Sequence, residues 1–215
     1  MFCGLKCNNT TENGESAERQ IQKRDIIMIR DIILKNRSYR RFKQTPISRK
    51  TLEELIDLAR LSPSAANKQP LKYILSCSKR KNNQIFPKLA WAGYLTDWPG
   101  PAEDERPTAY IVVLCDTEIS KSVSADQGIA SQSILLGAVE KGLGGCIIAS
   151  VHKQELRKAL DIPPQYDILF VIALGEPKET VVLETVGADG DIKYWRDKNS
   201  VHHVPKRKLK DIIVS

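Results

Sequence analysis

Residues 62–73, SPSAANKQPLKY, connect a helical pattern to a strand pattern and are the most distinctive stretch of the chain. Pro63 and Pro70 stiffen both ends of this segment, because proline fixes φ and lacks a backbone N–H. The small side chains between them leave backbone N–H and C=O groups accessible, and Asn67 and Gln69 each add an amide donor and acceptor. Such a segment suits a flat, heteroatom-rich ring, although an ordinary polar loop from helix to strand would explain the same residues.

The helix before this stretch is predicted over residues 49–61. Its apolar side chains recur at the spacing of one buried face: Leu52, Leu55, Ile56 and Ala59. Pro46 and Ser48 introduce this helix, and Thr51 and Glu54 have the spacing of a capping box. A rigid helix is therefore expected to deliver the loop that follows it.

Apolar and helical periodicity predict the remaining elements. Strands are predicted at residues 71–78, 109–115 and 167–174, and helices at residues 19–36, 83–92, 119–141 and 153–160. Gly187 and Gly190 bound a turn between two strand-like runs, residues 181–186 and 191–195, which predicts a hairpin. The glycines of residues 142–150, GLGGCIIAS, follow a helix and precede a strand, which is the reverse of the dinucleotide fingerprint. They most simply end the long helix.

Length and composition indicate one globular domain. The chain of 215 residues is 41% hydrophobic and 27% charged, which suits one core in residues 19–215 behind a polar, flexible tail, residues 1–18. No stretch approaches the roughly 18 apolar residues of a membrane span, and the N-terminus lacks the pattern of a signal peptide, so we expect a cytoplasmic protein. The five scattered cysteines indicate neither a disulfide framework nor a zinc site.

Positive charge gathers in two places. Residues 19–60 hold twelve Lys/Arg against five Asp/Glu, and a second basic cluster occupies residues 206–210. In the first region, residues 36–42 have the sequence NRSYRRF. Arg37, Ser38 and Arg40 could converge on a dianion there, because guanidinium groups grip phosphate oxygens in pairs. A basic helix end that complements the helix dipole is the plainer alternative.

The order NRSYRRF, helix, SPSAANKQP resembles the FMN-dependent nitroreductase family, whose usual signature is RRSxRxF followed by SPSxxNxQP. The resemblance implies that the first motif binds the FMN phosphate and ribityl chain through Arg37, Ser38 and Arg40. It implies that the second motif lines the flavin ring, commonly from the other subunit, through Ser64, Ala65, Asn67 and Gln69. Asn36 stands where the usual signature has its first arginine, so the resemblance assigns the phosphate contacts of this motif to Arg37, Ser38 and Arg40.

The same resemblance implies roles for later segments. The strand after the glycines would present the backbone of Ile147, Ile148 and Ala149 to the redox edge of the flavin. Lys206 and Arg207 lie where the family places a phosphate-binding pair, with Lys208 as the alternative one residue along. Residues 93–107 form a loop whose Tyr94 and Trp98 either cover a flat substrate or pin the loop to the core.

The implied fold is α+β and nitroreductase-like, with three layers in which a mixed, mostly antiparallel sheet is flanked by helices. The implied assembly is a homodimer that exchanges its C-terminal segments and places its active sites at the subunit interface. We expect a small-molecule substrate, no nucleic acid and no membrane as partners.

The implied function is that of an FMN-dependent oxidoreductase, which takes hydride from NADH or NADPH and reduces nitroaromatics, quinones or similar flat acceptors. Since both substrates would use one open flavin face, we expect ping-pong kinetics. FMN would carry the electrons, so we expect no essential catalytic side chain and no metal site. His152, His202 and His203 lie in polar segments and are expected to be solvated. The alternatives are an FMN-binding or sensing protein without fast turnover, and a basic nucleic-acid-binding module.

Overall fold

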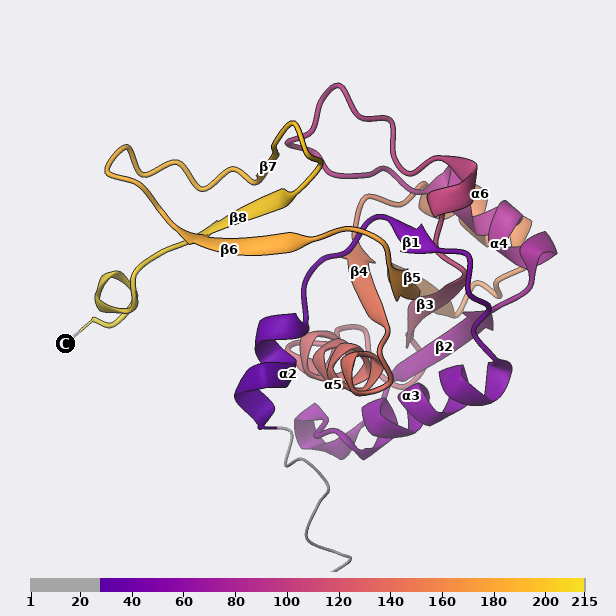
Figure 1. Ribbon diagram of the computed structural model, residues 1–215. Coiled ribbons are helices and arrows are strands. Elements are labelled where there is room, and N and C mark those ends of the chain that lie inside the picture. The colour runs from indigo at the N-terminus through magenta and orange to yellow at the C-terminus, as the bar shows by residue number, and fades with distance from the viewer. Residues whose placement is uncertain (1–27, 215) are drawn as a thin grey trace, which may run out of the picture.

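A computed structural model describes residues 28–214 of the chain (Figure 1). The predicted tail, residues 1–18, and the first part of the helix predicted over residues 19–36 lie outside the described residues. The described part of that helix is α2 (Ile29–Lys35).

The main sheet is antiparallel. Its five strands are β1 (Phe42–Lys43), β2 (Leu71–Ser76), β3 (Ala109–Asp116), β4 (Gly144–Ile148) and β5 (Tyr166–Pro177). The order is β1-β5-β3-β2, and β4 also pairs with β5. Val171 of β5 pairs with Val112 of β3 and with Ile148 of β4, so β5 lies in the interior of the sheet.

Helices cover both faces of this sheet (Figure 1). One face carries α3 (Arg49–Leu61) and α5 (Asp126–Glu140), and the other carries α4 (Lys79–Ile85) and α6 (Lys153–Ala159). Alternate residues of a strand point to opposite faces. Accordingly, Ile111 and Val113 of β3 pack in the core that contains α3 and α5, whereas Val112 and Leu114 pack in the core that contains α4 and α6. The predicted three-layer α+β fold is therefore confirmed.

The boundaries of α3 agree with the prediction, but its cap does not. Ser48 is the N-cap residue, and its Oγ accepts a hydrogen bond from the backbone N–H of Thr51 at 3.0 Å. Glu54 takes no part in a capping box, because its carboxylate accepts a hydrogen bond from Lys141 Nζ of α5 at 2.6 Å. The capping box predicted from Thr51 and Glu54 is wrong, and Ser48 caps the helix instead.

Three predicted boundaries are also wrong. The helix predicted over residues 119–141 is α5, which begins only at Asp126, since Ser124 has a φ of 43° that interrupts helical geometry. The strand predicted to reach residue 78 ends at Ser76, because Ser78 instead caps α4 through its Oγ. The helix predicted over residues 83–92 starts earlier, as α4, and then tightens into the short 3-10 turn η3 (Phe86–Lys88), which contains a proline.

A second sheet extends away from the body of the molecule (Figure 1). It contains β6 (Val181–Thr185), β7 (Trp195–Arg196) and β8 (His202–Lys206), followed by the 3-10 turn η5 (Leu209–Asp211). β8 lies between the other two strands, parallel to β6 and antiparallel to β7. The predicted hairpin is wrong, because β8 pairs with β6 in place of the residues that follow the glycine turn. We call residues 181–211 the arm.

Candidate functional site

Ligand sites are typically cavities of about 300–1,000 Å³, and a cavity of 330 Å³ lies where the arm meets the main sheet. Five residues predicted for the site line it: Arg37, Ser38, Arg40, Ile147 and Lys206. The other lining residues are Asn36, Gln132, Leu135, Gly145, Tyr194, His202 and Val204. Segments far apart in the sequence therefore meet around a strongly basic space.

The segment before β1 is held beside β4 by backbone contacts. The N–H of Tyr39 donates to the carbonyl oxygen of Gly145 at 3.0 Å, and Ser38 forms a parallel bridge with Gly145. Gly145 is required at this point, since a Cβ atom there would lie 2.7 Å from the carbonyl oxygen of Ala173 on β5. This close approach sets Arg37 and Arg40 along the edge of β4.

Arg37 and Arg40 are oriented by different partners. Arg37 Nη2 donates to the carbonyl oxygen of Ile33 in α2 at 2.8 Å, and its Nε is buried without a hydrogen-bond partner among the described residues. Arg40 is almost completely buried, and its Nη1 donates to the carbonyl oxygen of Ser38 at 3.2 Å. The guanidinium carbon of Arg40 lies 4.7 Å from the centre of the Tyr194 ring, within cation–π range.

His202 contradicts the prediction of a solvated histidine. It is 0% exposed, and its Nε2 lies 3.2 Å from Arg40 Nη1. Burial lowers its pKa to about 4, with the positive charges of Arg40, Arg196 and His203 acting in the same direction. The burial of His202 could not be predicted from the polar sequence around it, because its partner Arg40 lies 162 positions away. His203 is also largely buried, and its Nδ1 lies 2.5 Å from Oε1 of Glu184. His152, in contrast, is exposed.

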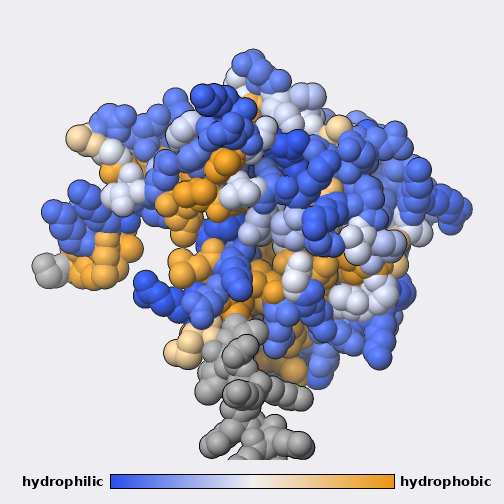
Figure 2. All heavy atoms as spheres, in the orientation of Figure 1, coloured by the Kyte–Doolittle hydropathy of each residue, from blue (hydrophilic) through white to orange (hydrophobic). Residues whose placement is uncertain are grey.

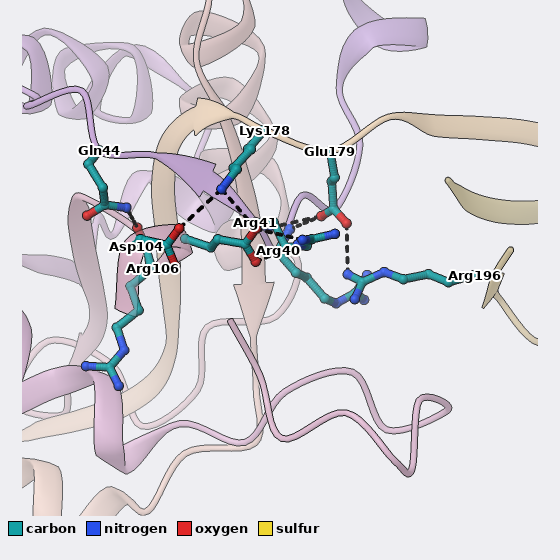
Figure 3. Close-up of polar contacts among 9 residues, drawn as sticks. Arg40, Arg41, Gln44, Asp104, Arg106, Lys178, Glu179 and Arg196 are labelled. Carbon is teal, nitrogen blue, oxygen red and sulfur yellow. Dashed lines mark hydrogen bonds and ion pairs between the residues drawn. The ribbon is translucent and has the colours of Figure 1, made fainter. Parts of the chain in front are cut away.

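Glu179 connects residues 36–42, which we call the basic motif, to the arm (Figure 3). Its Oε1 accepts hydrogen bonds from the backbone N–H groups of Arg40 and Arg41, and its Oε2 accepts one from Arg196 Nη2 at 2.8 Å. Sequence reasoning missed Glu179 as a residue of the site. Nothing in the local pattern marks it, because its partners lie 139 residues before it and 17 residues after it.

A smaller cavity of 170 Å³ adjoins the first one. Arg40 and Ile147 line both, and the smaller one also contains the other two predicted residues of this strand and its end, Ile148 and Ala149. Ile147 is exposed while Ile148 is buried, as alternation along β4 requires. The structure thus brings the first motif and the strand after the glycines together.

The loop of residues 62–70 lies elsewhere in the same chain. Ser64 and Gln69 line a separate cavity of 280 Å³ that shares no residue with the two around Arg40. Ala65 and Asn67 are exposed. Ala66, Asn67 and Gln69 have φ of 51°, 54° and 53°, in the left-handed region. Within one chain, the two predicted halves of the site are therefore not brought together.

Asp126, at the start of α5, holds this loop in shape. Its Oδ2 accepts from Ser64 Oγ at 2.5 Å, and its Oδ1 accepts from the backbone N–H of Ala65 at 2.9 Å. These two hydrogen bonds lower the pKa of Asp126 below its ordinary value. Asp126 was not among the predicted site residues, since it lies 61 positions after Ala65.

The loop of residues 93–107 packs against the arm. The Tyr94 ring lies 4.9 Å from that of Tyr194, and the guanidinium carbon of Arg196 lies 4.3 Å from the centre of the Trp98 ring. Tyr94 and Trp98 also line an open cavity of 890 Å³. The contacts favour the pinning interpretation for Trp98, whereas half of the Tyr94 surface is exposed. Arg207 is exposed and lines neither cavity around Arg40.

Two negative findings apply to residues 28–214. No group of three or more His, Cys, Asp or Glu side chains is arranged to hold a metal ion. No helix in this part of the chain has the length and apolarity needed to cross a membrane.

Comparison with known proteins identifies the family. The profile described as "Nitroreductase family" matches residues 33–99 and 115–176, more than half of the chain. A protein of Archaeoglobus fulgidus named "Putative NADH dehydrogenase/NAD(P)H nitroreductase" is 28% identical over 156 residues, which cover 69% of this chain and 84% of the relative. An NADPH-flavin oxidoreductase of Vibrio harveyi is 26% identical over 160 residues, covering 69% of this chain and 65% of the relative.

A solved structure agrees with the sequence match. The crystal structure of a nitroreductase family protein from Clostridium novyi NT superimposes with a TM-score of 0.60 at 25% identity, covering 87% of this chain and all of that one. The antiparallel three-layer α+β fold of the chain agrees with this family match. The chain belongs to the nitroreductase family.

Proposed function

We propose that the protein is an FMN-dependent oxidoreductase that accepts electrons from NADH or NADPH and reduces flat acceptors such as nitroaromatics and quinones. The observation that carries this proposal is the convergence of Arg37, Ser38, Arg40 and Lys206 on one cavity beside β4. The names of the Archaeoglobus and Vibrio relatives describe the same class of reaction.

The charges of the cavity fit a phosphate dianion. Its lining contains three cationic side chains and no aspartate or glutamate. Within residues 28–214, the side chains of Arg37, Arg40 and Lys206 form no ion pair with a carboxylate, and Arg37 Nε lacks any partner. Buried cationic donors without acceptors are costly, so an anion with several acceptor oxygens would satisfy them. The phosphate and ribityl hydroxyls of FMN are such acceptors.

When bound, FMN supplies the hydride acceptance and donation of the reaction. The protein side chains would hold the phosphate through Arg37 and Lys206, with Arg207 close by in sequence. Arg40 would place a fixed positive charge near the ring, and the backbone of Ile147, Ile148 and Ala149 would lie along it. No side chain of the chain is assigned a catalytic role, and Tyr94 and Trp98 would border the acceptor.

We also propose a homodimer in which the loop of residues 62–70 completes the cavity of the partner subunit. Its separation from Arg40 within one chain supports this arrangement. Apolar side chains are exposed on α2, on the arm and just beyond it: Ile33, Leu34, Leu183, Leu209, Ile212 and Ile213. Figure 2 shows hydrophobic surface near the C-terminus and in the hollow between it and the body of the molecule. Such surface is normally covered by a partner. A cytoplasmic location is part of the proposal and agrees with the free thiols of Cys77, Cys115 and Cys146.

Anaerobic reduction tests the proposal. The purified protein should show the visible flavin band, lose it on addition of NADH or NADPH, and regain it when a nitroaromatic or quinone is added. Arg37→Gln should weaken FMN retention, and Arg49→Gln, an exposed control at the start of α3, should not. A colourless protein that cannot be reconstituted with FMN would overturn the proposal. Slow reduction by both nicotinamides would instead make it an FMN-binding or sensing protein.

A further inference from the structure

His202 and Arg40 form a buried pair whose hydrogen-bonding direction is fixed by chemistry. His202 Nε2 lies 3.2 Å from Arg40 Nη1. A guanidinium group only donates hydrogen bonds, so Nε2 of His202 must be the acceptor and carry no proton. The ring proton then sits on Nδ1, which has no hydrogen-bond partner among the described residues.

The surroundings keep this imidazole neutral. Arg40 faces it from the segment before β1, Arg196 from β7, and His203 is its neighbour on β8. Glu179, which contacts both of these arginines, is already engaged by the Arg196 side chain and by the backbone N–H of Arg40. Burial together with these positive charges lowers the pKa of His202 to about 4. At neutral pH the ring is an acceptor and adds no charge.

The guanidinium of Arg40 is thereby held on three sides. Nη1 donates to both the Ser38 carbonyl oxygen and His202, and the flat face of the group lies over the Tyr194 ring. Nε and Nη2 of Arg40 form no hydrogen bond within the described part of the chain. Neither of these two atoms is fully buried. These two donors form one edge of a planar fork, the edge suited to a ligand with paired acceptors.

We infer that His202 is a positioning residue, which aims the unpaired edge of Arg40 into the 330 Å³ cavity by accepting a hydrogen bond as the neutral Nδ1–H tautomer. The inference rests on the proposed function, in which that cavity holds FMN. His202 and Tyr194 both belong to the arm, so the arm supplies the support for the basic motif as well as Lys206. The positive charge presented to the cofactor would then be constant across the neutral pH range.

The tautomer can be tested without the cofactor. ¹⁵N NMR of the full-length protein, prepared free of FMN, should show His202 protonated at Nδ1 and not at Nε2, with no titration between pH 8 and about 5.5. Protonation at Nε2, or titration near the ordinary histidine pKa of about 6.5, would overturn the inference whether or not FMN binds.

The positioning role is tested by a double-mutant cycle read out as FMN dissociation constant and flavin midpoint potential. His202→Leu removes the acceptor, and we expect about tenfold weaker binding and a more negative potential, as for contacting, coupled residues. His202→Gln retains an acceptor oxygen and should recover most of both. In an Arg40→Gln background, His202→Leu should have little further effect. Additive effects of the two substitutions would overturn the inference, whereas failure of the wild-type protein to bind FMN would overturn the proposed function.

Thermal denaturation of each variant verifies that it is folded. If His202→Leu does not fold, the test rests on the NMR result and on the comparison of the wild-type protein with His202→Gln and Arg40→Gln.

Discussion

Glu179 and Arg196 form an ion pair of 2.8 Å inside the protein, with the Glu179 side chain only 1% exposed. The same carboxylate accepts hydrogen bonds from the backbone of Arg40 and Arg41. Because Arg196 also lies over the Trp98 ring, one acidic side chain joins the basic motif, the arm and the loop of residues 93–107.

Replacing Glu179 should therefore be costly. Glu179→Ala leaves Arg196 and two backbone donors unpaired in the interior, and breaking such a pair costs about 3–5 kcal/mol of unfolding free energy. Urea denaturation measures this. The matched control is Glu176→Ala, three residues earlier, whose pair with Lys43 is partly exposed and should be worth about 0–1 kcal/mol. Equal losses in the two variants would contradict the role of Glu179.

Gly145 is required by close packing beneath the cavity. In Gly145→Ala the new Cβ would lie 2.7 Å from the Ala173 carbonyl oxygen, a backbone atom that cannot move without disturbing β5. We expect a loss of about 1–3 kcal/mol of unfolding free energy. Gly93→Ala, where no atom lies within 4 Å, should change it by less than about 0.5 kcal/mol. Indistinguishable denaturation curves for the two variants would refute the packing argument.

The buried His202 predicts a dependence of stability on pH. Its folded pKa of about 4 lies below the unfolded value of about 6.5, so the unfolded chain binds a proton that the folded chain does not. Stability should therefore decrease as the pH falls from about 6.5 to about 4. Urea denaturation at a series of pH values should show a shallower decrease for His202→Gln, while His152→Gln, at an exposed position, keeps the wild-type slope. An unchanged slope in His202→Gln would rule out this source of the dependence.

Asp126 should act on the loop of residues 62–70 more than on the core. Asp126→Ala removes the acceptor of Ser64 Oγ and Ala65 N–H and leaves three left-handed residues without their anchor. Hydrogen exchange should show faster exchange in the loop, and FMN should bind less tightly. The pKa of Asp126 is lowered in the folded state, so its contribution is present above the unfolded value of about 3.9 and is lost as the pH falls through the folded pKa. Asp57→Ala, at an exposed helical position, is the control and should leave loop exchange unchanged.

Asn67 tests the loop itself. Its side chain is exposed, and among residues 28–214 its one side-chain hydrogen bond is accepted from Gln69 Nε2 at 3.1 Å. Asn67→Leu should therefore keep the melting temperature within a few degrees and still weaken FMN retention, measured by cofactor fluorescence after gel filtration. Asn83→Leu, on the exposed side of α4, should retain FMN normally. If Asn67→Leu retains FMN as well as the wild-type protein does, the loop of residues 62–70 is only a connection between α3 and β2.

Local patterns predicted the parts of the fold that local forces determine. The apolar stripe of α3 gave its boundaries, and the continuous apolar run of β3 reflects burial on both faces. The errors arose where a distant segment decides. β6 pairs with β8 rather than with the residues after its own turn, and His202 is buried by an arginine from the other end of the chain. Polarity alone cannot distinguish a solvated histidine from one that a distant partner covers.

The candidate site divides in the same way. Arg37, Ser38, Arg40, Ile147 and Lys206 could be predicted because sequence motifs marked them, and one cavity brings them together. Glu179, Asp126 and Tyr194 could not be predicted, since each acts through a contact with a segment remote in sequence. Assignment of the predicted residues to FMN remains a prediction.

The placement of β8 between β6 and β7 has a consequence for how the chain can vary. The segment of residues 186–194 joins two strands that never touch, so its length is not tied to any strand register. Gly190 turns the chain there with open space around it. Insertions of several residues at this tip would leave the pairing of the arm intact, which makes it a natural position for length variation among relatives and for attaching a reporter group.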